Sequence, residues 1–524
     1  MLSHRFFVSL LAIALASGRV ADAQQTRLPA TPSSVDEATL ADHLRRWVGL
    51  LADDSLRGRQ TGTPTERAAA AYIAREAMRL GLQPAGDSCS FYHRVPLEMK
   101  RWEWTARATT TSSGAVRFTP GEVFPTPWAN FTPNSRTQAQ GPLVYAGYVN
   151  DPGVPPAQRL TPKQMAGAVI ILRGAHPPGS TSERELPPFL TLDYTRPQSR
   201  TAAAILLVAE GRAAAYAQEW HQITEHGRLG APEWKKPFDH APIFWITPEV
   251  AEQLLGQPLA SARMPRTGLG TFSYTLRRVA TPIEGQNVVA VFPGRDPARR
   301  GEYVALGAHY DGIGVRSPMA GDSIYNGADD NASGVVALLE VAKRFTALPI
   351  EQRPARSLLF VWHTAEEGGL HGSAHFTARP TVPLKSIVAY LNLDMVGRNH
   401  PDSLHVVGPR RLSTQLGEAV EAVNHRQARP FVLDYTLDAP KHAEGVFCRS
   451  DHLNYAKHGI PVVFFTTGQH PDYHRPSDEA GKLNYAKLAR ITVLAGDLAA
   501  ELANRPARPV VDKPVRQYPE GCQQ

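Results

Sequence analysis

The stretch that decides the fold of this chain is residues 302–334, EYVALGAHYDGIGVRSPMAGDSIYNGADDNASG. The apolar run Tyr303–Ala308 leads into His309 and Asp311, and a glycine-rich loop then passes through Asp330 into an apolar helical pattern. This order of strand, loop and helix is typical of an α/β sheet. A His and a carboxylate delivered in this way predict two ligands of one metal site, but such residues at strand ends are more often solvated polar groups. Further ligands must therefore come from the rest of the chain.

Strand-like and helix-like patterns alternate from residue 286 onward. The strand-like runs are short, apolar and rich in β-branched or aromatic residues. The predicted strands are Val288–Phe292, Tyr303–Ala308, Leu358–Trp362, Ile387–Leu393 and Pro461–Phe465, and the predicted helices are Val335–Phe345 and Leu412–Val423. Because continuous apolar strands alternate with helices, we expect an α/β fold with a mixed, mostly parallel sheet covered by helices on both faces.

Two more helices are predicted near the N-terminus. Residues 35–51 and 64–80 carry apolar residues at helical spacing. Thr63 and Glu66 have the spacing of a capping box, and Gly81 is the expected stop. The glycine-rich loop between these helices lacks the Gly-Lys-Ser/Thr of a phosphate-binding loop, so we interpret it as a connector.

The composition of the chain changes between about residues 120 and 280. Proline and glycine are frequent, and apolar runs such as 167–172 and 203–208 alternate with turn-rich loops. A short helix is predicted over residues 247–255. No His, Asp and Glu cluster at ligand spacing occurs in this segment. We therefore expect a second, β-rich domain without chemistry of its own.

Length, composition and charge narrow the class of protein. A chain of 524 residues is too long for one ordinary core, so two domains are expected. Its hydrophobic content of 42% and charged content of 20% are globular values. The formal net charge is +7, but the arginines are scattered and form no basic block. Nucleic acid is therefore not expected as a partner.

The first 23 residues have the pattern of a secretion signal. A mildly positive start precedes the apolar run Phe6–Ala16, and Ala21-Asp22-Ala23 resembles a cleavage site. A membrane anchor is the poorer interpretation because a span needs roughly 20 apolar residues. We expect an extracytoplasmic protein, periplasmic or secreted, with no integral membrane segment after removal of the signal.

Three cysteines, Cys89, Cys448 and Cys522, are too few for a disulfide scaffold and lack C-x-x-C spacing. After export, one pair could form a disulfide and leave one free thiol. The sequence does not choose the pair, and a cysteine nucleophile is not expected.

Polar residues gather where the predicted strands end. They are His309 and Asp311, Glu366 and Glu367, Asp394, and Tyr473 and His474, with Asp330 on the loop before a helix. Sites in open α/β sheets lie beyond the carboxyl ends of the strands, so these side chains are expected to converge. Each alone has a structural explanation, such as surface charge or a helix cap. Their joint occurrence favours a site.

The charge of this cluster predicts bound metal. Carboxylates so crowded cannot all ionise unless cations offset them. Two His with three carboxylates suit zinc, or less specifically cobalt or manganese, and five ligands fit two metals that share a carboxylate. Asp311 can accept the second imidazole N–H of His309. Of Glu366 and Glu367, one can bind metal while the other acts as general base.

Five segments match the motifs of one family. GAHYDGIG, GADDNASG, HTAEEGGLHGS, LNLDMVGR and PDYHRPSD resemble the signatures of the co-catalytic di-zinc exopeptidases, a family of secreted bacterial aminopeptidases, plasma glutamate carboxypeptidase and glutamate carboxypeptidase II. The resemblance covers about 286–505, with supporting likeness at 56–81. MAGAVIILRG and AAAILLV resemble, less closely, the protease-associated domain that many members carry as an insertion.

The resemblance implies a role for each residue of the cluster. His309 and Asp394 would bind one zinc, Glu367 and His474 the other, and Asp330 would bridge the two, followed by a cis peptide bond. Glu366 would be the general base for a water activated by the two zincs, with Asp311 supporting the site, and Tyr473 would help to hold the oxyanion. No motif residue departs from the active pattern, so an inactive member is not expected.

The implied organisation has five parts. These are a signal peptide (1–23), the N-terminal part of the peptidase domain (24–119), an inserted protease-associated domain (120–280), the catalytic di-zinc domain (281–505) and a C-terminal tail (506–524).

The leading prediction is an exported aminopeptidase that acts on peptides with a free N-terminus. A carboxypeptidase or dipeptidase would need arginines for the substrate carboxylate, and Arg398, Arg410 and Arg449 are the candidates. A glutaminyl cyclase is less favoured because those relatives use one zinc. A non-enzymatic binding protein would have lost ligands. Other histidines near the motifs are expected to be structural, and Asp451-His452 is the best candidate for a supporting pair.

Overall fold

The computed structural model describes residues 36–119, 121–125, 137–148, 153–175, 201–211, 227–230, 241–262, 264–439, 442 and 444–515, and the single positions 213, 214, 217, 218, 221 and 224. The predicted signal sequence, its cleavage site and Cys522 lie outside the described residues. Within the described part, no helix combines the length and apolarity needed to cross a membrane. Cys89 is a free, exposed thiol and Cys448 is disulfide-bonded.

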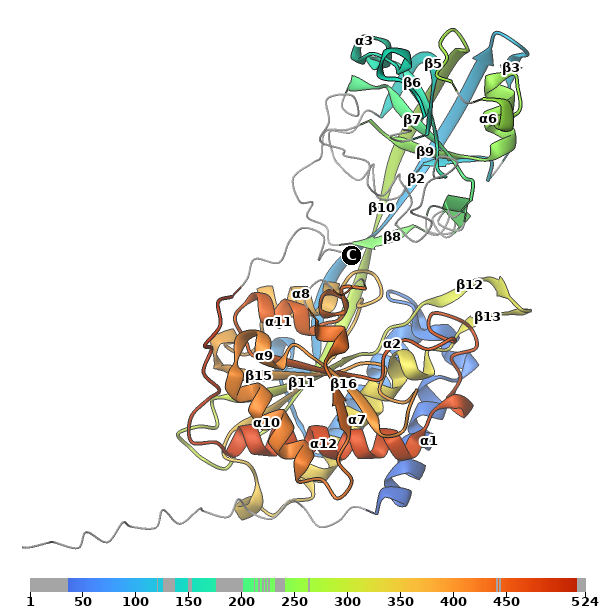
Figure 1. Cartoon of the computed structure of the whole chain (residues 1–524). Helices are drawn as coiled ribbons and strands as arrows, with labels where there is room; N and C mark the ends of the chain where they lie inside the picture. Colours follow the sequence, from blue (N-terminus) through green and yellow to red (C-terminus); the bar gives the residue numbers. More distant parts are fainter. Residues whose placement is uncertain are drawn as a thin grey trace, which may run out of the picture.

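The C-terminal region is built on a sheet with the strand order β17-β16-β18-β15-β11-β14-β10 (Figure 1). Its strands are β10 (Gly270–Phe292), β11 (Tyr303–His309), β14 (Ser357–His363), β15 (Ile387–Leu393), β16 (Ser403–Val407), β17 (Val432–Asp434) and β18 (Val462–Thr466). β18, β15, β11 and β14 are parallel, whereas β16 and β10 pair antiparallel with β18 and β14. The expected mixed, mostly parallel sheet is confirmed.

The parallel strands end at one edge of this sheet. His309 lies opposite His363 at the ends of β11 and β14, and Leu393 lies opposite Phe465 near the ends of β15 and β18. These strands are buried along almost their whole length, so an apolar side chain is favoured at nearly every position. Polar residues that follow the strands therefore meet at the common edge.

Helices cover both faces of the sheet. One face packs against α1 (Glu37–Leu51), α2 (Pro64–Arg79), α7 (Gly334–Thr346), α10 (Thr414–His425) and α12 (Tyr485–Asn504), and the other against α8 (His371–Ala378), α9 (Pro409–Leu412) and α11 (His452–Lys457). The helix predicted over 412–423 is α10, which starts two residues later because the Ser413 hydroxyl caps it by accepting the Leu416 N–H at 3.2 Å.

The start of α2 differs from the expected capping box. The Thr63 hydroxyl accepts the Glu66 N–H at 3.2 Å, as predicted. The Glu66 side chain returns to the backbone one residue before the cap, where its Oε2 accepts the Gly62 N–H at 3.1 Å, and its Oε1 accepts from the Thr364 hydroxyl at 2.6 Å. Gly81 follows the helix with φ +81°, a left-handed conformation that favours glycine, as expected for the stop.

The inserted region, expected over residues 120–280, continues the sheet, because its strand β5 (Gln138–Tyr148) pairs antiparallel with β10. Its other strands in this sheet are β4 (Val123–Pro125), β6 (Val169–Arg173), β7 (Ala204–Val208) and β9 (Ile243–Ile246), with helices α3 (Pro162–Met165) and α6 (Pro248–Leu255), whereas β8 (Arg228–Gly230) pairs with β2 (Tyr92–Thr110). The order is β5-β6-β7-β9-β4, and all pairs except β9–β4 are parallel. Both apolar runs and the helix predicted here are confirmed.

A long two-stranded ribbon joins the two regions (Figure 1). β2 (Tyr92–Thr110) pairs antiparallel with β10, from Tyr92 opposite Val288 to Thr110 opposite Gly270. The short strands β1 (Gln83–Pro84) and β3 (Gly114–Val116) pair with β10 and β2. A separate hairpin of β12 (Gly314–Met319) and β13 (Asp322–Tyr325) projects from the C-terminal region (Figure 1).

Candidate metal centre

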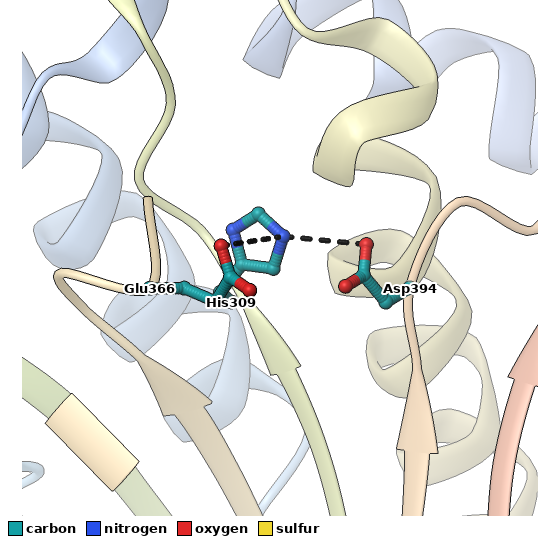
Figure 2. A group of neighbouring side chains, drawn as sticks. All are labelled: His309, Glu366 and Asp394. Atoms are coloured by element: carbon teal, nitrogen blue, oxygen red, sulfur yellow. Dashed lines mark hydrogen bonds and ion pairs between the residues drawn. The ribbon is translucent and has the colours of Figure 1, made fainter. Parts of the chain in front are cut away.

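The sheet edge brings the predicted cluster together. His309 is the last residue of β11, Asp394 directly follows β15, and Glu366 lies on the loop after β14. Figure 2 shows these side chains facing one another, with His309 between the two carboxylates. All are buried, with exposed fractions of 1% for His309 and 6% for the other two. Ligating atoms of these residues lie within 4.8 Å of one another, as do those of His309, Asp330 and Glu367.

Asp330 lies between the two imidazoles. Its Oδ1 is 3.2 Å from His309 Nε2, and its Oδ2 is 3.2 Å from His474 Nε2. Asp394 Oδ1 lies 3.3 Å from His309 Nε2, and Glu367 Oε2 lies 3.2 Å from His474 Nε2. The five residues therefore form two adjoining groups that share one carboxylate.

These spacings fit zinc. Ligand atoms bound at 2.0–2.1 Å to one tetrahedral zinc lie about 3.3 Å apart. The ligating atoms in both groups have nearly this separation, at 3.2–3.3 Å. In addition, Glu367 Oε1 is buried and has no hydrogen-bond partner in the described part of the chain. The donor set, two imidazole nitrogens and carboxylate oxygens, is one that zinc accepts.

The electrostatics of the cluster also favour added positive charge. Burial raises the pKa of Glu366, and the neighbouring Glu367 and Asp394 raise it further. Burial lowers the pKa of His474, but Glu367 and Asp330 more than offset this effect and bring the pKa to about 10. Despite burial, hydrogen bonds from the two imidazoles hold the pKa of Asp330 well below its usual range. The negative charge of the cluster thus favours bound positive charge, either as protons on the imidazoles and Glu366 or as cations.

Asp311 lies beneath the cluster but in a different relation to His309 than expected. The Nδ1 atom of His309 is 3.2 Å from the Asp311 backbone carbonyl and 3.7 Å from the Asp311 carboxylate. The carboxylate instead accepts the N–H groups of Glu366 at 3.1 Å and Glu367 at 3.4 Å, and the Thr61 hydroxyl at 2.9 Å. Asp311 therefore holds the loop that carries both glutamates.

Several supporting residues were missed in the sequence. Arg59 is fully buried and donates to backbone carbonyls of Tyr310 at 2.9 Å and Gly327 at 3.0 Å, on both sides of the glycine-rich loop that leads to Asp330. The segment interpreted as a connector is therefore part of the site. The sequence gives no signal of this role, because the burial of Arg59, which makes its guanidinium need partners, is visible only in the fold.

Asp478 and Ser450 were also missed. The Asp478 carboxylate accepts the N–H groups of Asp329 and Asp330, both at 3.0 Å. The Ser450 hydroxyl donates to Asp394 Oδ2 at 2.7 Å. The predicted supporting pair Asp451-His452 is buried, but the direct hydrogen bond to a candidate ligand comes from the preceding serine. The peptide bond after Asp330 is cis, as expected.

A cavity of about 490 Å³ opens onto the cluster. Tyr473 lines it beside His474, and the two rings stack with centroids 3.8 Å apart. The predicted arginines do not meet there. Arg398 is held by Asp472 at 2.7 Å and Arg410 by Glu421 at 2.9 Å, so that of the three only Arg449 lines the cavity.

The other histidines lie outside the ligand groups. His363 is buried in the sheet with its Nε2 3.2 Å from the Tyr455 hydroxyl. His452 stacks on Phe464 with centroids 4.7 Å apart, and His470 Nε2 lies 3.3 Å from Asp329. These contacts agree with the structural roles that were expected.

Solved structures support the fold. The aminopeptidase from Aneurinibacillus sp. strain AM-1 superposes with a TM-score of 0.53 at 19% identity, covering 91% of this chain and 98% of that one. BSAP, a zinc aminopeptidase from Bacillus subtilis, gives a TM-score of 0.52 at 18% identity over the same shares. At this identity the likeness concerns the arrangement of the chain.

Sequence relatives match about two fifths of this chain. A probable leucine aminopeptidase of Trichophyton verrucosum is 32% identical over 227 residues, which are 41% of this chain and 57% of that protein. The Escherichia coli protein YfbL, whose function is uncharacterized, is 32% identical over 240 residues, 40% of this chain and 70% of its own length. The match therefore spans little more than half of the Trichophyton relative.

The family model described as Peptidase family M28 matches residues 287–499. This range contains every residue of the metal cluster, from His309 to His474. Together, the match to this family model and the match to YfbL over 70% of its length show that the chain belongs to peptidase family M28.

Proposed function

We propose that this protein is an exported metallo-aminopeptidase that removes N-terminal residues from peptides. One observation carries the proposal: the two oxygens of Asp330 each lie 3.2 Å from a different imidazole, at the floor of an open cavity. Metal-dependent peptide hydrolysis needs such a cluster with room for a substrate. The relatives named as aminopeptidases support cleavage at the N-terminal end of the substrate.

The residues present would hold two zinc ions. His309 and Asp394 would bind one, Glu367 and His474 the other, and Asp330 would bridge them. When bound, zinc polarises a carbonyl oxygen and makes a water molecule more acidic. Cobalt or manganese could substitute, because the donor set is nitrogen and oxygen.

Glu366 is proposed as the general base. It lines the cavity and makes none of the short contacts that join the five ligands, since its nearest oxygen is 3.9 Å from His309 Nε2. Its raised pKa, caused mainly by burial, suits a group that takes a proton from water and passes it to the leaving amine. Asp311 fixes its backbone, and the Tyr473 hydroxyl would donate to the oxyanion.

A carboxypeptidase or dipeptidase is the second candidate, and one observation favours it. Arg228 of the inserted region and Arg316 of the β12–β13 hairpin both line the cavity. In the described part of the chain Arg316 has no carboxylate partner within ion-pair distance; it donates to Gln60 and Val315. Such guanidinium groups suit a substrate carboxylate.

Matched substrates separate the two candidates. We would compare aminoacyl-p-nitroanilides with N-acetylated peptides that have a free carboxylate, each with and without a chelator. The aminopeptidase proposal predicts hydrolysis of the first set, lost on chelation and restored by Zn²⁺. Preferential hydrolysis of the N-acetylated set would contradict it in favour of a carboxypeptidase. Activity that survives chelation would contradict both.

Export rests on the sequence pattern alone. The apolar run Phe6–Ala16 and the small residues Ala21-Asp22-Ala23 support cleavage before Gln24. N-terminal sequencing of the protein recovered from periplasm and medium tests this. A cytoplasmic protein that retains Met1 would contradict it.

A further inference from the structure

Arg449 lies against Tyr473 at the wall of the cavity. Its Nη2 donates to the Tyr473 hydroxyl oxygen at 3.0 Å, and its Cζ lies 5.9 Å from the centre of the tyrosine ring. The other side of the tyrosine is also fixed, because the ring stacks on His474 at 3.8 Å with an interplanar angle of 24°. Both Arg449 and Tyr473 line the cavity.

The direction of this hydrogen bond matters chemically. A guanidinium is always charged and only donates, so it occupies a lone pair of the phenol oxygen and leaves the phenol hydrogen unused. Among the described residues, Arg449 is the sole hydrogen-bond partner of the Tyr473 hydroxyl. The hydrogen is therefore free for an acceptor that enters the cavity.

The position of Arg449 along the chain strengthens the inference. The next residue, Ser450, donates to Asp394 at 2.7 Å, and its hydroxyl accepts from Asn392 at 2.7 Å. The backbone at this point is thus tied to the ligand group of His309, while the Arg449 side chain reaches the ligand group of His474. Arg449 also has no carboxylate within ion-pair distance in the described part of the chain, so its charge acts mainly on the tyrosine.

We propose that Arg449 is a positioning residue that orients and polarises the Tyr473 hydroxyl for donation to a substrate oxygen. The inference rests on the proposed function, in which Tyr473 stabilises the oxyanion. It differs from the role that Arg449 would have in the carboxypeptidase alternative, where it was one of three candidates to bind a substrate carboxylate. A cation that donates to a phenol oxygen strengthens the phenol as a donor, because hydrogen bonds in a chain polarise one another.

A double-mutant cycle tests the proposal on the metal-loaded full chain. The variants are Arg449→Met, Tyr473→Phe and the pair, with Arg449→Lys as the conservative variant. Loss of one oxyanion donor costs about 10²–10³-fold in kcat. Arg449→Met is expected to lower kcat about 10–100-fold with KM within about 3-fold, and Arg449→Lys to recover part of this. The pair is expected to lie within about 3-fold of Tyr473→Phe alone.

The control is Arg410→Met, which removes an exposed arginine paired with Glu421 and should leave kcat unchanged. Multiplicative costs of the two single variants would overturn the proposal. So would a rise in KM restricted to substrates with a carboxylate, which would return Arg449 to substrate binding. A Tyr473→Phe variant with wild-type kcat would instead refute the assigned role of the tyrosine, and with it this inference.

A second readout does not depend on activity. With 3-fluorotyrosine at position 473, the ¹⁹F resonance of the metal-free protein should shift in Arg449→Met and stay unchanged in Arg410→Met. An unchanged resonance in Arg449→Met would overturn the proposal even if the enzyme were active. A shifted resonance in a protein without peptidase activity would uphold the contact while refuting the proposed function.

Discussion

Each region of this molecule has parallel strands whose ends meet at one edge, and the two edges differ in charge. In the inserted region, β6 ends at Arg173 and Glu210 follows β7. Arg173 Nε donates to Glu210 Oε1 at 2.6 Å, and Nη1 donates to the Leu259 carbonyl at 3.0 Å. In the C-terminal region the corresponding edge gathers carboxylates and two imidazoles, and in the described part of the chain no arginine forms an ion pair with Asp330, Glu367 or Asp394.

This difference shows that topology alone does not identify a functional site. Both edges lie where open sheets bind ligands. At the inserted edge one cation meets one anion, so the polar groups satisfy one another. At the other edge the carboxylates outnumber the protein cations, and only protons or metal ions can balance them. Excess charge that the fold leaves uncompensated is what distinguishes the functional edge.

The largest effect should come from removing the proposed base. Glu366→Gln keeps the shape of the side chain but cannot take a proton, so kcat should fall about 10²–10⁴-fold. Thermal stability should not fall, because burial of the charged form is unfavourable. The matched control is Glu249→Gln at an exposed position in the first turn of α6 in the inserted region, which should keep full activity. Comparable losses of kcat in the two variants would contradict the prediction that only the C-terminal edge takes part in catalysis.

A smaller loss is expected from Asp311→Asn. The amide keeps one acceptor oxygen, so its NH2 group would face either the Glu366 N–H or the Glu367 N–H, and the loop would shift. Changes to groups that orient ligands typically cost about 10–100-fold in activity or metal affinity. Steady-state kinetics and metal analysis check this. Asp322→Asn on the projecting hairpin serves as control. An unaffected Asp311→Asn enzyme would show that the loop with Glu366 and Glu367 keeps its position without the Asp311 carboxylate.

Removing the carboxylate of the Arg173–Glu210 pair in the inserted region should lower stability and leave activity unchanged. Glu210→Gln leaves Arg173 without its carboxylate in a site where the two side chains are 11% and 13% exposed, so unfolding free energy should fall by about 3 kcal/mol. Glu103→Gln, which breaks an exposed pair with Arg277, should cost at most about 1 kcal/mol. Urea denaturation measures both. Lost peptidase activity in folded Glu210→Gln would mean that the inserted edge has chemistry after all.

The smallest effect concerns the pH dependence of stability. Burial raises the pKa of Glu66 to about 7. Its neighbour Tyr310 has one hydroxyl hydrogen and lies 2.6 Å from the Gln286 carbonyl and 2.8 Å from Glu66 Oε1, so it can donate to the first and accept from a protonated Glu66. The pKa of Glu66 is higher in the folded than in the unfolded state. The stabilisation by protonated Glu66 is therefore complete below about pH 4.5 and is lost as the pH rises through 7.

Glu66→Gln should therefore be more stable than the wild type at pH 8 by on the order of 2 kcal/mol, and should match it near pH 4.5. Denaturation across this range measures the difference. Glu76→Gln on the same helix is the control and should leave the pH profile unchanged. A Glu66→Gln profile parallel to that of the wild type would show that Glu66 is ionised in the folded protein.

The sequence predicted the elements and the cluster well because both depend on local patterns. The apolar runs gave the buried strands, and polar residues beyond their ends gave His309, Asp330, Glu366, Glu367, Asp394 and His474, which the fold brings together. What escaped prediction depends on contacts between distant segments. Arg59, Asp478 and Ser450 act on backbone or side chains far away in the chain, and no spacing rule reveals such partners.

Two expectations failed for a related reason. Glu66 has the spacing of a capping box, but one of its oxygens accepts the hydroxyl of Thr364, almost 300 residues away, and the other accepts the N–H of Gly62 instead of that of Thr63. Asp311 has the spacing to support His309, but the nearby backbone N–H groups of Glu366 and Glu367 take its oxygens. Tertiary partners override local spacing when both compete for one polar group.

A metal titration of the stripped full-length protein, with metal content and peptidase activity measured on the same samples, tests the Asp330 bridge most directly. A bridged site should bind two zinc ions per chain, and activity should continue to rise until the second equivalent is bound. Asp330→Asn should retain at most one tight ion and little activity. Full activity with one ion per chain, or an Asp330→Asn protein that still binds two, would contradict the central claim that Asp330 joins two metal ions at the charged edge.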